Sequence, residues 1–404
     1  MDFKKLEELY KMELFDNVLP FWLRHSPDRE CGGYFTCLNR DGSVFDTDKF
    51  VWLQARQVWL FSMLYNEVEQ RQEWLDCALL GGEFLKKHGH DGAYNWYFSL
   101  DRQGNPLVEP YNIFSYTFAT MAFARLGKAT GNAVYSEMAL HTFETVLARR
   151  DNPKGKWEKA YPGTRPLKNF ALPMILCNLA LEMEHLLDEK FLMELMEECI
   201  HEVTEVFYCP ELGGIIVENV TTDGSLSDTF EGRTVNPGHA IEAMWFIMDL
   251  GVRLHRPDLI EKAVKITLTM LEYGWDKQYG GIFYFMDRKG CPPEQLEWDQ
   301  KLWWVHVETL ISLLKGYHLT QSGDCLRWFE KLHDYTWSHF KDRAYPEWFG
   351  YLNRRGEVLL PLKGGKWKGC FHIPRGLYQC WKTFKQINNS TAMSDRRDFL
   401  KKTP

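Results

Sequence analysis

The segment GGIFYFMDRKG, residues 280–290, decides the fold because versions of it recur along the chain. Each version opens at a Gly-Gly or similar turn, continues through a short run that alternates aromatic and polar residues, and closes at a second turn ending in glycine. The other copies span Gly32–Gly42, Gly92–Gly104, Gly213–Gly224 and, as a variant, Tyr345–Gly356. Such repetition is typical of folds built from stacked supersecondary units.

The spacing of these connectors predicts how many units the chain contains. Their closing glycines are 62, 120, 66 and 66 residues apart, and because 120 is about twice 60, one more connector is expected near residue 160. Residues 151–166, rich in Lys, Gly and Pro, occupy that position. Between connectors, apolar residues recur at helical spacing in two segments each time. Examples are Trp52–Val68 with Glu73–Lys87, and Pro237–Leu250 with Asp258–Tyr273.

Two further helices complete the predicted architecture, one near Phe3–Leu23 and one after Pro374, which gives twelve helices in six pairs. An open helical array, serving as a binding scaffold, would need polar capping repeats at its ends. The first and last helices instead carry apolar residues, namely Phe21, Trp22, Leu377 and Trp381. We therefore expect an all-α protein: a single (α/α)6 barrel over residues 1–390, with short β-ribbons at one mouth and a flexible polar tail over 391–404.

Composition narrows the possible classes of function. The net charge of -7 and the lack of a long basic run argue against nucleic-acid or anionic-membrane partners. The ten cysteines include no Cys-x-x-Cys pair, and the N-terminus is charged, so we expect reduced thiols and a cytoplasmic protein. No apolar run is long enough for a membrane span. The 16 tryptophans suit either an aromatic-lined cleft for sugar rings or core packing.

Charged residues interrupt several of the predicted inward faces. Arg56 lies on one face with Trp52, Trp59 and Met63, where a buried guanidinium needs an anionic or hydrogen-bonding partner. A structural ion pair is the alternative interpretation of this position. Glu308 similarly lies within an apolar stripe beside a tryptophan, Trp304.

Two histidines are predicted at helix starts. In Asn236-Pro237-Gly238-His239, the asparagine is a good N-cap and the proline suits the first helical position, so His239 falls in the first turn with Glu242 on the same face. The positive helix terminus should keep this histidine neutral, although a capped core histidine is the alternative. His372 stands just before the last helix, whose first turn holds Arg375.

These residues favour proton transfer over other chemistry. No P-loop, dinucleotide-binding glycine pattern or His-Glu-x-x-His metal motif is present, and we expect no metal. Glu242 and Glu308 could act as the two carboxylates of a glycosidase, which leaves that reaction open. A pair of histidines suits removal of a proton next to a carbonyl and its return from the opposite face, with arginines stabilising the enolate oxygen.

From about Phe21 to Gln379 the chain resembles the N-acylglucosamine 2-epimerase family, also known through the renin-binding proteins. The stretches that carry this resemblance are Lys49–Trp59, Asn236–Glu242, Leu296–Glu308, Glu347–Arg354 and Lys363–Arg375. The resemblance implies an (α/α)6 barrel and a homodimer. It also implies reversible C2 epimerisation between N-acetylglucosamine and N-acetylmannosamine, which begins with opening of the sugar ring.

The same resemblance implies roles for individual residues. His239 and His372 would be the two acid/base groups, in an undetermined assignment to the two faces of the sugar. Arg56 and Arg375 would hold the developing negative oxygen, and Glu308 would orient a histidine or bind a sugar hydroxyl. Glu242 is counted with the substrate-binding residues.

The irregular connector resembles the segment of this family that binds ATP, an allosteric activator that is not consumed. Four cations would hold the nucleotide: Lys154, Lys156, Lys159 and Arg165. Without a Walker pattern, a solvated basic loop is the alternative. The loop Lys363–Gly369 also looks suited to phosphate, but its place before His372 favours a role in shaping the sugar pocket.

Three alternatives remain at this point. One is another sugar epimerase or an aldose-ketose isomerase with the same proton-transfer residues, and the second is a glycosidase. The third is a non-catalytic protein-binding module, since the renin-binding name records a partner. The sequence also leaves open whether the pathway is sialic acid synthesis or amino-sugar salvage.

Overall fold

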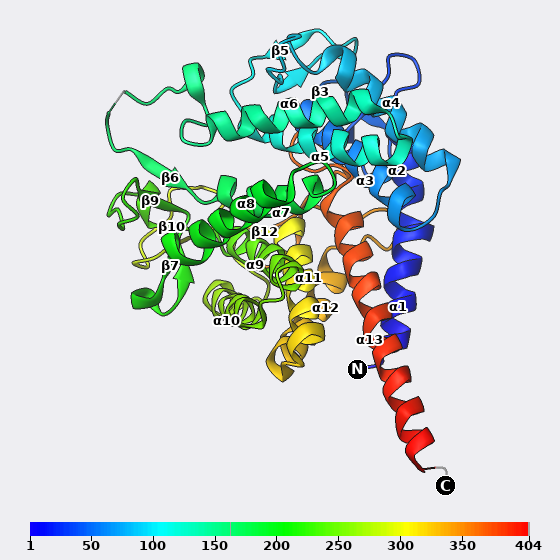
Figure 1. The fold of residues 1–404 in the computed structure, drawn as a ribbon, viewed down its shortest axis with the longest axis vertical. Coiled ribbons are helices and arrows are strands. Elements are labelled where there is room, and N and C mark those ends of the chain that lie inside the picture. The colour runs from blue at the N-terminus through cyan, green and yellow to red at the C-terminus, as the bar shows by residue number, and fades with distance from the viewer. Residues whose placement is uncertain (162, 403–404) are drawn as a thin grey trace.

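The computed structural model describes residues 1–161 and 163–402, with side chains up to residue 390. Over this part of the chain, twelve helices alternate between an inner and an outer ring (Figure 1). The inner helices are α3 (Val51–Glu67), α5 (Ile113–Thr130), α7 (Ala171–Met183), α9 (Pro237–Arg253), α11 (Trp303–Thr320) and α13 (His372–Lys402). The outer helices are the continuous run α1 (Phe3–Met12), η1 (Glu13–Val18) and α2 (Leu19–His25), then α4 (Gln72–His88), α6 (Ala133–Arg149), α8 (Glu189–His201) with η3 (Glu202–Val206), α10 (Pro257–Gly274) and α12 (Gly323–His339).

The inner helices form the ring because most of their side chains are apolar and buried all round. Each packs on the next in chain order, from α3 through to α13. The ring closes where α13 returns to α3: the rings of Phe371 and Trp59 lie 5.3 Å apart, and Tyr378 Oη donates to Glu67 at 2.9 Å. The predicted (α/α)6 barrel is confirmed.

The first and last helices meet, as their apolar composition predicted. The rings of Phe15 and Trp381 lie 5.3 Å apart, and those of Phe3 and Phe384 lie 6.1 Å apart, and Figure 1 places α1 alongside α13. This contact is what an open array would lack. The backbone of residues 391–402, expected to be a separate tail, continues α13, while residues 403–404 lie outside the described part. No helix among the described residues is long and apolar enough to cross a membrane.

The short strands lie in the connectors at one mouth. They are β1 (Cys37–Leu38), β2 (Val44–Asp46), β3 (Lys49–Phe50), β4 (Ser99–Leu100), β5 (Pro106–Val108), β6 (Leu167–Asn169), β7 (Tyr208–Cys209), β8 (Ile215–Ile216), β9 (Asn219–Thr221), β10 (Thr234–Val235), β11 (Met286–Asp287), β12 (Lys301–Leu302), β13 (Tyr351–Leu352) and β14 (Val358–Leu360). A strand that enters an inner helix pairs antiparallel with the next connector, as β3 does with β4 and β12 with β13. Lys363 N donates to Leu38 O at 3.0 Å, which joins the last connector to the first.

Three buried ionic clusters tie the connectors together. In each, a buried aspartate after an outer helix accepts from a buried lysine at the entrance of the next inner helix, and from an arginine of a neighbouring connector. The clusters are Asp28 with Lys49 and Arg102, Asp276 with Lys301 and Arg354, and Asp342 with Lys363 and Arg40. The third cluster joins the last connector to the first, so it closes the ring of connectors around the mouth of the barrel.

The Gly-Gly turns of the repeat have a steric cause. Gly280 and Gly281 have φ values of +75° and +73°, a region that residues with a Cβ rarely adopt. A Cβ on Gly281 would also lie 2.7 Å from the ring of Tyr335 on α12. Glycine therefore lets the connector turn directly against the outer helix.

Candidate active site

His239 lies in the first turn of α9, as predicted. Asn236 Oδ1 accepts from the His239 backbone N–H at 3.1 Å, and Pro237 occupies the first helical position. The imidazole Nδ1 lies 3.0 and 3.2 Å from the two carboxylate oxygens of Glu218. The His239 side chain is 26% exposed, so solvent reaches this ring.

The expectation that the surroundings of His239 favour its neutral form is not supported. Burial lowers the pKa of His239, but the adjacent Glu218 carboxylate more than offsets it and leaves the pKa raised. A full negative charge at hydrogen-bond distance outweighs the partial positive charge of a helix terminus. Glu218 was missed in the sequence, where the only signal is one carboxylate within the apolar run 215–220.

His372, Glu308 and Arg375 form a second, more deeply buried cluster with Glu242. His372 Nδ1 lies 2.8 Å from Glu308 Oε1, and Arg375 Nη2 lies 2.7 Å from the same oxygen. Arg375 Nη2 also donates to Glu242. The sequence predicted that the last helix begins after Pro374, but it begins at His372. Pro374 fits inside the first turn because the N–H groups there have no partner within the helix.

The pKa of His372 moves in the opposite direction from that of His239. Burial lowers it, the Arg56 and Arg375 charges lower it further, and Glu242 does not offset them, so the pKa lies well below its usual value. His372 is therefore neutral near pH 7. With Nδ1 donating to Glu308, its Nε2 carries the free lone pair.

Arg56 has aromatic contacts and no ion pair with any described residue. Its guanidinium carbon lies 4.4, 4.0 and 4.6 Å from the ring centroids of Trp52, Phe118 and Phe371. The Nε has no acceptor among the described residues, and burial lowers the pKa of Arg56 to about 9. The alternative of a structural ion pair is thus not supported, and this cation is free to bind an anionic oxygen.

Trp304 connects the two histidine clusters. Its ring centroid lies 5.2 Å from that of His239 and 5.8 Å from that of His372. Trp245, on the same face of α9 as Glu242, donates through Nε1 to Glu308 Oε2 at 2.9 Å, a role that the sequence reasoning missed. All six predicted catalytic and substrate-binding residues thus lie around one space inside the barrel.

The model of the family described as N-acylglucosamine 2-epimerase matches residues 33–374. The chain belongs to this family. It is 41% identical to the N-acylglucosamine 2-epimerase of Bos taurus over 386 residues, covering 93% of this chain and 91% of that protein. It is 39% identical to the Homo sapiens protein of the same name over 376 residues, covering 90% and 87% of the two chains. The structure of cellobiose 2-epimerase from Spirochaeta thermophila superposes with a TM-score of 0.79 at 20% identity, covering 95% of this chain and 98% of that one, which supports the barrel fold.

One group of residues in this member of the epimerase family has the spacing of a metal site. Ligand atoms of Glu242, Glu308 and His372 lie within 4.8 Å of one another. Arg375 Nη2, however, is hydrogen-bonded to both carboxylates and lies 3.4 Å from His372 Nδ1. The guanidinium is therefore the cation that compensates these carboxylates.

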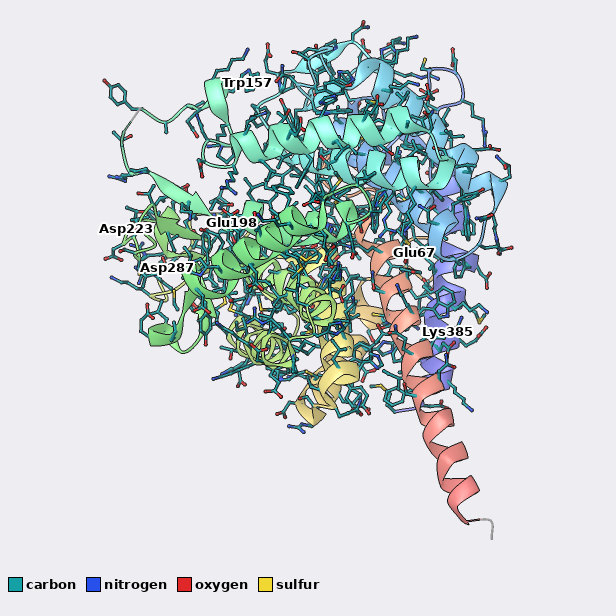
Figure 2. The ribbon with its side chains drawn as sticks, in the orientation of Figure 1. Glu67, Trp157, Glu198, Asp223, Asp287 and Lys385 are labelled. Carbon is teal, nitrogen blue, oxygen red and sulfur yellow. The ribbon has the colours of Figure 1, made fainter. Side chains whose placement is uncertain are left out.

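The four cations predicted to bind nucleotide lie apart from the site. Lys154, Lys156, Lys159 and Arg165 are all exposed. They belong to the loop that leaves the body of the barrel between α6 and β6, where Trp157 is labelled (Figure 2). Lys154 Nζ lies 3.1 Å from Glu158.

Two of the three lysines in the loop 363–369 are not available to phosphate, contrary to the expectation from sequence. Lys363 and Lys368 are buried in ion pairs with Asp342 and Glu347 at 2.8 Å each. The loop does border the site, because the ring of Trp367 lies 5.8 Å from that of Trp52, which stacks on Arg56.

Proposed function

We propose that this protein reversibly epimerises an N-acylated amino sugar at C2, interconverting N-acetylglucosamine and N-acetylmannosamine. The observation that carries the proposal is the pair of histidines that both lie beside Trp304, one with a raised pKa and one with a lowered pKa. Groups whose environments separate their pKa values in this way can act as acid and base together. The name of the bovine and human relatives supports the acylamino sugar as substrate.

The reaction follows from these charges. In the open-chain sugar, neutral His372 takes the C2 proton through Nε2, and the C–H electron pair moves toward C1 to give an enolate oxygen. Arg56, which has no anionic partner among the described residues, stabilises that oxygen. Protonated His239 then donates its proton to C2 from the opposite face. In the reverse direction the two histidines exchange roles.

A glycosidase fits this site poorly. Such an enzyme needs one carboxylic acid and one carboxylate that flank the scissile bond. Glu242 and Glu308 instead accept hydrogen bonds from one guanidinium, that of Arg375, and Glu308 is fully buried. A non-catalytic binding module is also disfavoured, because burying this many charges costs free energy without serving an outer surface.

Proton NMR of N-acetylglucosamine incubated with the protein in deuterated water tests the function. We expect N-acetylmannosamine to form with deuterium at C2. A ketose product would indicate an aldose-ketose isomerase, and an unchanged, undeuterated sugar, with and without ATP, would exclude the proposed reaction.

For the connector at residues 151–166 we propose ATP as an allosteric activator that is not consumed. Its four cations and the resemblance support this site. The loop leads directly into β6, whose Asn169 Nδ2 lies 3.4 Å from Glu218 Oε1. A nucleotide bound to the loop can therefore act on the His239 cluster through β6. The resemblance also supports a homodimer, and the free cysteines support a cytoplasmic protein. The pathway is either sialic acid synthesis or amino-sugar salvage.

Replacing Lys154, Lys156 and Arg165 with alanine should abolish the stimulation by ATP and leave the basal rate of epimerisation within about twofold, because these side chains lie on an exposed loop. The measurement is the initial rate with and without ATP. The control replaces three exposed lysines of outer helices, Lys4, Lys190 and Lys265, with alanine. Full stimulation in the loop variant would place the nucleotide elsewhere.

A further inference from the structure

Glu218 is held rigidly between two inner helices. It lies between β8 and β9, where its backbone N–H donates to Thr234 O at 3.0 Å and its carbonyl accepts from Phe170 N at 2.9 Å. Thr234 precedes α9, and Phe170 precedes α7. The side chain is 10% exposed, and both of its oxygens face His239 Nδ1. The carboxylate is thus placed by the barrel scaffold and not by a mobile loop.

The two histidines of the site each contact one glutamate, but the two glutamates differ in what else they contact. Glu308 accepts from three groups, and one of them, Arg375, is a cation that compensates its charge. Within the part of the chain whose side chains are described, Glu218 has only one further side-chain neighbour at hydrogen-bond distance, the neutral amide of Asn169 at 3.4 Å. Among the described residues, no lysine or arginine forms an ion pair with Glu218.

Because of this contrast, the two glutamates stabilise a proton on their histidines to different extents. The charge of Glu308 is shared with Arg375, so a proton on His372 gains little from it, whereas the charge of Glu218 is available to His239 alone. A hydrogen bond at Nδ1 also fixes the tautomer and leaves Nε2 available in both rings, as no described residue is hydrogen-bonded to Nε2 of either.

We propose that Glu218 is a positioning residue that orients His239 through Nδ1 and supplies the negative charge that lets this histidine carry the proton donated to C2. The inference rests on the proposed epimerisation and deepens it, because it assigns the acid to His239 and the base to His372 in one direction of the reaction. Each turnover moves one proton from C2 to His372 and one from His239 to C2, and proton exchange of both imidazoles with water restores their starting states.

The test uses Glu218→Gln, in which the amide oxygen can still accept from Nδ1–H and only the charge is lost. Glu231→Gln is the control, because Glu231 is exposed on the same connector and makes the same change in charge. Titration of the histidines by nitrogen-15 NMR in the sugar-free protein, with His239→Asn to assign the signal, should show that His239 loses its proton at lower pH in Glu218→Gln. The titration of His239 should be unchanged in the Glu231→Gln control.

The pH profile of C2 exchange gives the second readout. In Glu218→Gln, kcat near neutral pH should fall at least about tenfold and recover partly toward lower pH, while KM changes less than about threefold. Glu218→Asp keeps the charge and should restore the titration of His239 toward that of the unaltered protein.

An unchanged titration of His239 in a folded Glu218→Gln protein would overturn the inference. So would a loss of kcat that is the same at every pH, since that is the signature of a purely structural role. The NMR titration needs no substrate, so it separates this inference from the proposed function: absence of exchange in the unaltered protein would contradict the epimerisation, and the titration would still decide whether Glu218 sets the charge of His239.

Discussion

His372→Ala should lower the rate of C2 deuterium exchange by at least about a thousandfold, because it removes the neutral base that takes the C2 proton. The fold should survive, since Glu308 keeps its hydrogen bonds from Arg375 and Trp245 after the imidazole is lost. The exchange rate by NMR and the thermal unfolding midpoint, measured on the same preparation, separate these two effects.

A matched control is His318→Ala, which removes an imidazole near the opposite end of α11 from Glu308. It should retain nearly full exchange activity. If His372→Ala exchanged C2 at a rate close to that of the control, His372 would have no part in the proton transfer.

Much of the barrel could be predicted because its signals are local. The glycines of each connector repeat indicate its turns directly. The N-cap Asn236 with Pro237 fixes the start of α9 from consecutive residues. The inward direction of Arg56 also followed from helical spacing alone. Such signals need no knowledge of the rest of the fold.

The electrostatics of the site could not be read in this way, because they depend on partners distant in the sequence. His239 gains its charge partner from a connector 21 residues earlier, and Trp245 contacts a glutamate 63 residues later. Lys363 and Lys368 look free in the sequence, but Asp342 and Glu347 of the same connector bind them. A helix-terminus argument predicted the wrong direction for the pKa shift of His239 because it considered the nearest backbone and not this carboxylate.

Replacing Arg125 with methionine should lower the free energy of unfolding by about 3–5 kcal/mol, because it leaves the buried Glu182 carboxylate without its cation and Glu67 with only the more distant Lys382. Arg125 on α5 binds Glu67 of α3 at 2.6 Å and Glu182 of α7 at 2.5 Å, and its side chain is 14% exposed. One guanidinium therefore links three inner helices. Figure 2 shows Glu67, one of its two partners, next to α13. Urea unfolding curves measure the change.

The ion pair of Arg125 with Glu67 should also make the free energy of unfolding depend on pH in the acid range. Burial by itself would raise the pKa of Glu67, but Arg125, Lys382 and Tyr378 outweigh it and lower the pKa to about 2. Because the folded pKa lies below the unfolded value of about 4.3, the stabilisation is complete above that value and is lost as the pH falls toward 2. The Arg125→Met protein should show a shallower loss of stability over this range.

The control for Arg125→Met is Arg253→Met, which breaks ion pairs with Glu184 and Glu189 on the surface, at the end of α9. Exposed pairs of this kind contribute about 0–1 kcal/mol, since water and salt screen them. A similar small loss in both variants would mean that the interior carboxylates have another source of compensation. A much larger loss for Arg125→Met, with acid sensitivity reduced, would identify this guanidinium as the residue that holds the inner helices α3, α5 and α7 together.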